Sequence, residues 1–278
     1  MTSIVGMRYE TGYLLSADCN TTFKDPVFPI MEWQSTGSKF YPVTPTIWIT
    51  MAGVAVAPDT YRPAVEPVQD IRPLVGTSLN STIFAVGLAS QGPALCVARK
   101  GKRSIIKSYE VAGSGAKHLQ GVLRKGYHSG MSIDAAIDLA ERALEEACSK
   151  DKYTKWPYEH IAAESGKLTF YTATIEFIDR IAKPLGDIGL AKSDHQIVRF
   201  DYEIKDRSDL WSERRRKEWE NDDKAGTVEF YKRHGDNDEE ANKKVDKMHQ
   251  KGELSRKRRL EDSLRQLNLL KNGSQQSA

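Results

Sequence analysis

Thr2, the second residue of the chain, has the chemistry of a nucleophile if it becomes the first. Cells often remove an initiating methionine when the next residue is as small as threonine. Thr2 would then carry both a hydroxyl and a free α-amine, a group whose pKa is about 8. Such an amine is partly neutral at pH 7 and can accept the proton of the hydroxyl. Thr2 would therefore combine a nucleophile and its base in one residue.

The residues after Thr2 predict a β-hairpin that starts at the beginning of the sequence. The two apolar runs 4–9 and 13–17 flank Glu10-Thr11-Gly12, a short turn sequence that contains glycine. A second pair of strands is predicted between Lys39 and Gly53, with a proline-containing turn between them and a small-residue run at the end. Taken alone, the first hairpin could equally be an ordinary edge hairpin.

The order and spacing of these two segments resemble the proteasome β-subunit family, the threonine-type N-terminal nucleophile hydrolases that begin Thr-Thr/Ser-Ile-Val-Gly. The resemblance implies that Asp18 and Lys39 form an ion pair that activates Thr2, and that Gly53 donates its backbone N–H to the oxyanion. The alternative for Asp18 and Lys39 is a surface ion pair of little consequence. The residues that the resemblance assigns to substrate binding are Met51 and Asn20.

Later parts of the chain continue the resemblance. Residues 82–87, 94–98 and 105–111 predict strands, and Gly113-Ser114-Gly115 is similar to a family motif whose serine hydrogen-bonds the N-terminal amine. Ser132 is a good N-cap for an amphipathic helix over residues 133–148. Ser165 stands in a segment similar to one in which the family has an aspartate three residues before a serine. Ala162 occupies the position of that aspartate.

Four closely spaced prolines interrupt residues 54–80, where the family has two long helices: Pro58, Pro63, Pro67 and Pro73. Because proline breaks helices, this segment predicts that one helical layer is reduced. Residues 201–278 contain 19 Lys/Arg and 18 Asp/Glu, too many charges for a hydrophobic core. We therefore expect a domain over residues 1–200 and a charged helical or disordered tail over residues 201–278.

The composition limits the kinds of function that we expect of this chain. Net charge is +3, and the basic runs 214–217 and 256–259 are flanked by acids, so nucleic-acid binding is the weakest interpretation. The three cysteines are widely spaced, which suggests neither a disulfide framework nor a zinc site. Neither a transmembrane run nor a signal peptide is expected, and we expect a location in the cytoplasm, the nucleus or both.

The resemblance implies an α+β fold: an α/β/β/α sandwich of two mainly antiparallel sheets. It also implies a threonine-type endopeptidase that acts on peptides or unfolded proteins, with no metal or cofactor and with other proteasome subunits as further partners. In that reading Thr2 is the nucleophile, and Ser114 and Ser165 hold its amine. Ala162 and the proline-rich segment keep open the alternative of a non-catalytic structural or interaction protein of the same kind.

Overall fold

The computed structural model describes most of the first three-quarters of the chain and scattered residues beyond. The described residues are 2–24, 32–53, 70–74, 80–172, 201–207, 213, 217, 228, 231–232, 237–248, 250–251, 254–255, 258, 261–262 and 265. The chain divides into two compact units, residues 1–205 and residues 206–278. Each unit is described by itself below.

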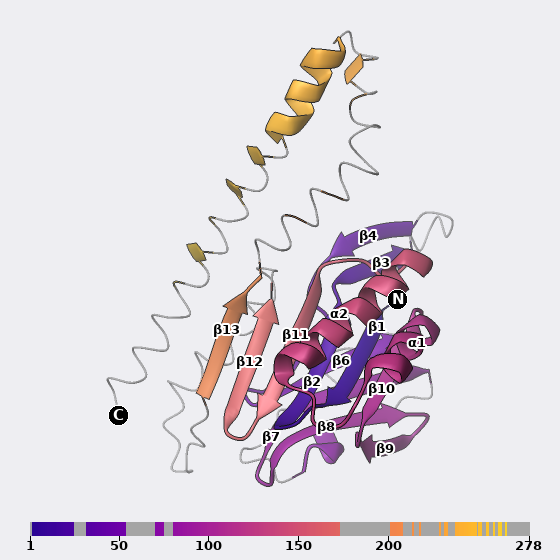
Figure 1. The fold of residues 1–278 in the computed structure, drawn as a ribbon, viewed down its shortest axis with the longest axis vertical. Helices are drawn as coiled ribbons and strands as arrows, with labels where there is room; N and C mark the ends of the chain where they lie inside the picture. Colours follow the sequence, from indigo (N-terminus) through magenta and orange to yellow (C-terminus); the bar gives the residue numbers. More distant parts are fainter. Residues whose placement is uncertain are drawn as a thin grey trace. The chain divides into compact units, whose positions relative to one another are not determined.

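The first unit contains a six-stranded sheet in the order β10-β1-β2-β11-β12-β13 (Figure 1). Pairing is antiparallel between β10 and β1, β1 and β2, β2 and β11, and β11 and β12. The strands are β1 (Ser3–Arg8), β2 (Gly12–Asp18), β10 (Tyr109–Gly113), β11 (Tyr158–Glu164), β12 (Lys167–Thr172) and β13 (Asp201–Asp206). The hairpin expected at the start of the chain is thus β1–β2, in the middle of a sheet rather than at its edge.

The second sheet has five antiparallel strands in the order β5-β6-β7-β8-β9. They are β5 (Tyr41–Thr44), β6 (Ile47–Gly53), β7 (Ser81–Ala89), β8 (Gly92–Arg99) and β9 (Lys102–Ile105). The single strand predicted over residues 105–111 is divided between the two sheets, because the chain leaves β9 at Ile105 and enters β10 at Tyr109. A separate two-stranded sheet, β3 (Asn20–Lys24) with β4 (Glu32–Thr36), lies between β2 and β5 in the sequence.

The two sheets pack face to face through large apolar side chains. The ring centroids of Trp48 in β6 and Phe170 in β12 are 5.2 Å apart. Gly6 in β1 faces Phe84 and Leu95 of the second sheet so closely that an added Cβ would lie 3.1 Å from each. All four of those larger side chains are fully buried. This contact places one hydrophobic core between the sheets, as the sandwich prediction requires.

Two helices, α1 (Ala116–Gly126) and α2 (Ile133–Lys150), cover the outer face of the six-stranded sheet (Figure 1). The predicted cap of α2 is present, since Ser132 accepts a hydrogen bond from the Ala135 N–H. The apolar stripe of α2 packs with Leu119 and Leu123 of α1 against Met7 and Leu14 of the sheet. The α+β sandwich of two mainly antiparallel sheets, with this helical layer, is therefore confirmed.

The predicted reduction of the second helical layer falls largely outside the described residues. Within 54–80 the structure describes only residues 70–74 and 80, which include a short 3₁₀ helix, η2 (Arg72–Leu74). Ile71, just before η2, is buried in an apolar cluster on the outer face of the second sheet, together with Ile49 and Ile83.

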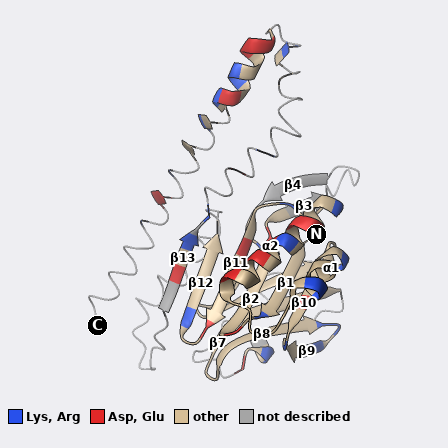
Figure 2. Cartoon of the chain, in the orientation of Figure 1, with Lys and Arg blue, Asp and Glu red and all other residues tan. Residues whose placement is uncertain are grey.

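The charged tail begins later than expected, because β13 extends the six-stranded sheet beyond residue 200. In this strand Glu203 forms an ion pair of 2.7 Å with Lys167 of β12. In the second unit, residues 238–248 are helical, and acidic and basic side chains alternate along that stretch (Figure 2). Asn237 caps this helix by accepting from the Glu240 N–H, and Ala241 and Val245 are buried. No described helix is long and apolar enough to cross a membrane.

Candidate active site around Thr2

A buried ion pair lies next to the beginning of β1. Asp18 ends β2, and Lys39 precedes β5 on a segment that crosses from one sheet to the other. The Lys39 Nζ donates to both carboxylate oxygens of Asp18, at 3.0 Å each. The Lys39 side chain is 8% exposed, and the Asp18 side chain is fully buried. The pair is therefore not the solvent-screened surface pair of the alternative interpretation.

Asp18 also holds the backbone beside Thr2. Its Oδ1 accepts the Ser3 N–H at 2.7 Å, and its Oδ2 accepts the Asn20 N–H at 3.2 Å. Burial raises the pKa of the Asp18 carboxyl above its ordinary value, while Lys39 and these two N–H donors oppose the rise. Asp18 thus connects the ammonium of Lys39 to the peptide unit that joins Thr2 to Ser3.

Thr2 is fixed from the other side by the end of β10. The Ser114 N–H donates to the Thr2 carbonyl oxygen at 3.1 Å. Gly113 has a positive φ of 102°, and an added Cβ at this position would lie 1.5 Å from the same oxygen. The approach of β10 to Thr2 therefore requires glycine at residue 113. Thr2 itself is 8% exposed.

Four polar side chains form a hydrogen-bonded group beside Thr2, which we call the hydroxyl cluster: Ser3, Ser114, Asp151 and Thr154. The Asp151 Oδ2 accepts from the Ser114 hydroxyl at 2.5 Å and from the Thr154 hydroxyl at 2.8 Å. A hydrogen bond of 2.6 Å connects the Ser3 and Thr154 hydroxyls. Because Thr154 gives its one proton to Asp151, Ser3 is the donor in that bond, and its oxygen accepts the Gly115 N–H at 3.2 Å.

The hydroxyl cluster favours an ionised Asp151. Burial alone would raise the pKa of this carboxyl, but donation from Ser114, from Thr154 and from the Tyr153 N–H outweighs it and lowers the pKa. An ionised carboxylate with two hydroxyl donors beside the first residues of the chain can orient a cationic or hydrogen-bonding amine. The cluster therefore has the chemistry expected of the group that holds the Thr2 amine.

Asp151 and Thr154 correct the assignment made from the sequence. The resemblance places an aspartate three residues before a serine, and Asp151-Lys152-Tyr153-Thr154 has the same spacing, with threonine in place of serine, immediately after α2. The sequence analysis looked for the pattern at Ser165 and found Ala162 in place of the carboxylate. The local signal was the Asp-x-x-Thr spacing at the helix end, and contact with Ser114 distinguishes it from the later segment.

Ser165 does not reach this site. It lies in the turn between β11 and β12, and β11 pairs with β2 so that Tyr158 is opposite Asp18 while Glu164 is opposite Gly12. Seven residues of extended strand separate Tyr158 from Ser165, which is about 20 Å. Ala162 is buried in the core beneath the helices. Ser165 therefore lies away from Thr2, whereas Asp151 contacts Ser114 beside it.

The other predicted residues lie at or near strand ends. Gly53 ends β6, is exposed and has a φ of 118°, so its backbone is in a region that favours glycine. Met51 is half-buried and packs against the outer cluster of the second sheet, and its role in the substrate pocket stays a prediction. Asn20 is buried, and its side-chain amide donates to the Tyr153 carbonyl at 3.0 Å. Asn20 therefore connects the Asp18 region to the loop that carries Asp151.

No cluster of His, Cys, Asp or Glu within the described residues has the composition of a metal site. The chemistry available around Thr2 consists of a carboxylate–ammonium pair, a second carboxylate with hydroxyl donors, and backbone N–H groups. Such a set suits acyl transfer by a hydroxyl nucleophile, in which charge develops on oxygen and protons move over short distances.

Comparison with known proteins agrees with this geometry. A family model described as proteasome subunit matches residues 75–161. The proteasome subunit beta 2 of Korarchaeum cryptofilum (strain OPF8) is 35% identical over 65 residues, which are 23% of this chain and 33% of that protein. The chain therefore spans about a third of the length of the curated relative it matches. The segment matched by the family model contains Ser114, Asp151 and Thr154, and it ends before β12.

Proposed function

We propose that the chain is a threonine-type endopeptidase of the proteasome β-subunit kind whose nucleophile is Thr2, a proposal that its partial similarity to proteasome subunits supports. The observation that carries this proposal is the buried ion pair of Lys39 with Asp18, whose carboxylate accepts the N–H of the residue after Thr2. A buried pair costs desolvation, so a chain that needed only stability would gain little from it. Its position beside Thr2 gives it a chemical use.

In the proposed reaction, removal of Met1 frees the Thr2 amine, which accepts the proton of the Thr2 hydroxyl as the hydroxyl oxygen attacks a peptide carbonyl carbon. The Lys39 ammonium favours the negative charge that develops on the attacking oxygen, and the Gly53 N–H favours the charge on the carbonyl oxygen. The protonated amine then gives its proton to the departing peptide amine. Water hydrolyses the resulting ester of Thr2, which restores the free hydroxyl.

The hydroxyl cluster has a holding role in this proposal. Ser114 binds the Thr2 backbone through its N–H and binds Asp151 through its hydroxyl. Asp151 and Thr154 supply the carboxylate and hydroxyl that orient the Thr2 amine toward its own side chain. We further propose peptides or unfolded proteins as substrates, other proteasome subunits as partners, and the cytoplasm or nucleus as the location.

The test is covalent labelling by a peptide that carries a threonine-directed electrophile, followed by mass spectrometry of the intact chain. The same spectrum establishes whether Thr2 is the first residue. We expect the wild type with a free Thr2 to be labelled and Thr2→Ala to remain unlabelled. Lys39→Ala should slow labelling on the order of 10²–10³-fold, the usual loss when one electrostatic contribution to such a transition state is removed.

Matched serine variants separate the two assignments of the amine-holding group. Ser114→Ala and Ser165→Ala make the same chemical change, but only Ser114 hydrogen-bonds Asp151 and Thr2. We expect Ser114→Ala to slow labelling and Ser165→Ala to leave its rate unchanged. Full-rate labelling of Lys39→Ala would contradict the proposed site.

The second candidate is a non-catalytic relative that acts as a structural or interaction protein. It is favoured by the extent of the family match, which covers residues 75–161 and leaves out Thr2, Asp18 and Lys39. A wild type with a confirmed free Thr2 that resists labelling would support this candidate. Retention of Met1 or acetylation of Thr2 would support it as well, because either removes the proposed base.

A further inference from the structure

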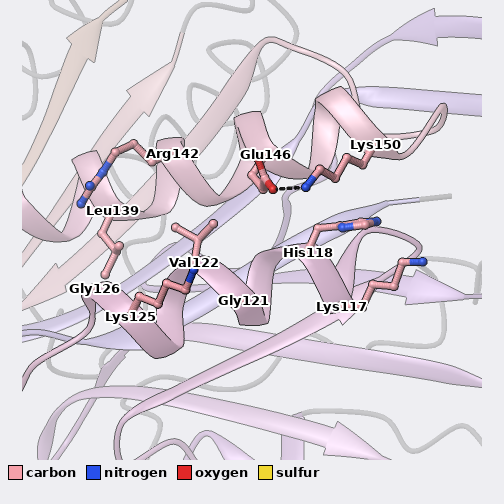
Figure 3. A pocket seen from close by; sticks show the side chains of 10 residues that line it. All are labelled: Lys117, His118, Gly121, Val122, Lys125, Gly126, Leu139, Arg142, Glu146 and Lys150. Carbon is pink, nitrogen blue, oxygen red and sulfur yellow. Dashed lines mark hydrogen bonds and ion pairs between the residues drawn. The ribbon is translucent and has the colours of Figure 1, made fainter.

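A groove of about 470 Å³ lies between α1 and α2, and its lining includes Leu139 of the core beneath the helices (Figure 3). Its floor is apolar and is formed by the half-buried Val122 and the buried Leu139, with Gly121 between the cationic residues of α1. An added Cβ at Gly121 would meet no atom within 4 Å. The glycine thus leaves open space beside α1, on the helical layer rather than between the two sheets.

The rim of the groove is cationic at both ends. Lys117 and Lys150 lie at one end, beside the His118 ring, and Lys125 and Arg142 lie at the other (Figure 3). Glu146 is the one acidic residue among the ten that line the groove, and it forms an i,i+4 ion pair with Lys150. The lining therefore has an excess of positive charge, although α2 as a whole is acidic.

We propose that this groove binds an acidic peptide segment of a partner protein, with an apolar side chain on the floor and carboxylates at the two cationic ends. The positive charge of the rim favours an acidic partner. The apolar floor favours a partner that also has an apolar side chain over one that has charges alone. A volume of this size fits several side chains and is larger than a single phosphate or carboxylate group needs.

The spacing of the two ends defines the peptide. Lys117 and Lys125 are eight residues apart on one helix, which is about 12 Å along its axis. An extended peptide advances about 3.3 Å per residue, so carboxylates about three to four positions apart reach both ends. The apolar residue lies between them, above Val122 and Leu139. The expected motif is thus acidic residues on both sides of one or two leucines.

Fluorescence anisotropy with the full chain and a labelled peptide of sequence Asp-Glu-Leu-Leu-Asp-Glu, blocked at both ends, tests this proposal. We expect saturable binding that weakens as salt is raised. Two control peptides each lack one of the recognised features. The neutral peptide Asn-Gln-Leu-Leu-Asn-Gln lacks the carboxylates, and Asp-Glu-Gly-Gly-Asp-Glu lacks the apolar side chains, so each should bind at least about tenfold more weakly.

Protein variants locate the binding. The double variant Lys125→Glu with Arg142→Glu should weaken binding by about tenfold or more, whereas Lys100→Glu with Lys102→Glu makes the same charge change on the exposed β8–β9 turn and should have little effect. Gly121→Leu fills the groove without changing charge and raises helix propensity, so it should abolish binding in a folded protein. Equal binding by wild type and Gly121→Leu, or by both charge variants, would overturn the proposal. So would binding of a heparin oligosaccharide in the absence of any binding of the acidic peptide.

Discussion

The Lys39 ammonium is held 3.0 Å from each oxygen of the Asp18 carboxylate, and both side chains are buried. Charges so placed interact strongly with each other and weakly with solvent salt. Loss of one partner leaves the other buried and unpaired, which costs far more than loss of an exposed pair.

Lys39→Met should lower the free energy of unfolding by about 3–5 kcal/mol, the usual cost of leaving a buried charge without its partner. The double variant Asp18→Asn with Lys39→Met should recover much of that loss. Lys167→Met removes an exposed pair with Glu203 and should cost less than about 1 kcal/mol. Urea denaturation of the full-length variants measures all three. Equal losses for Lys39→Met and Lys167→Met would show that the Asp18 pair contributes no more than a surface pair.

Asp151 should make the fold sensitive to acid. Its pKa is lowered in the folded chain, so the ionised form contributes stability above the ordinary aspartate pKa of about 4. That contribution disappears as the pH falls through the lowered value. The difference in unfolding free energy between wild type and Asp151→Asn should therefore be largest above about pH 5 and should shrink toward pH 2. Denaturation at several pH values checks this, and parallel pH profiles for the two proteins would contradict it.

Gly113→Ala should destabilise the chain by more than its positive φ alone explains. The strain of a left-handed residue costs about 1–2 kcal/mol, which is the expected effect of the control Gly101→Ala, where an added Cβ meets nothing. At Gly113 the added Cβ also collides with the Thr2 carbonyl. Thermal unfolding of both variants should show a larger decrease in Tm for Gly113→Ala. Similar decreases would mean that Thr2 can move away without cost.

Limited proteolysis should separate the two units just after β13. The sequence alone placed the boundary at residue 200, but β13 continues the sheet to Asp206. Trypsin should therefore cut first at or beyond Arg207, including the basic run 214–217, because exposed polar segments are cleaved most readily. Mass spectrometry should find a lasting fragment that ends after residue 206. A fragment that ends before Asp201 would show that β13 opens easily.

The first hairpin and the α2 helix could be predicted because each has a strong local pattern, whereas the sandwich was implied by the family resemblance. The ends of β1 and β2 differ from the predicted runs by one residue. Residues 105–111 were harder, since apolar alternation continues across a point where the chain changes sheets. Hydrophobic periodicity reports burial and is insensitive to which sheet a strand joins.

The Thr2 site could be predicted only where the motif is contiguous in sequence. Asp18 and Lys39 were found because the hairpins around them match the family pattern, and their contact is as expected. The sequence analysis assigned the motif to Ser165, which precedes a predicted strand, and did not consider Thr154. The deciding fact is the hydrogen bond between Ser114 and Asp151, which joins residues 37 positions apart and leaves no trace in local composition.

The position of β1 between β10 and β2 affects the order of events during synthesis. Ser3 pairs with Gly113, so β1 waits for a neighbour that is made 110 residues later. At about 5–20 residues per second, that delay is roughly 5–20 seconds. During this interval the start of the chain is outside its sheet and open to an aminopeptidase, whereas in the finished fold Thr2 is 8% exposed. Exposure of the Thr2 amine would thus be a co-translational event with a time limit set by the topology of the sheet.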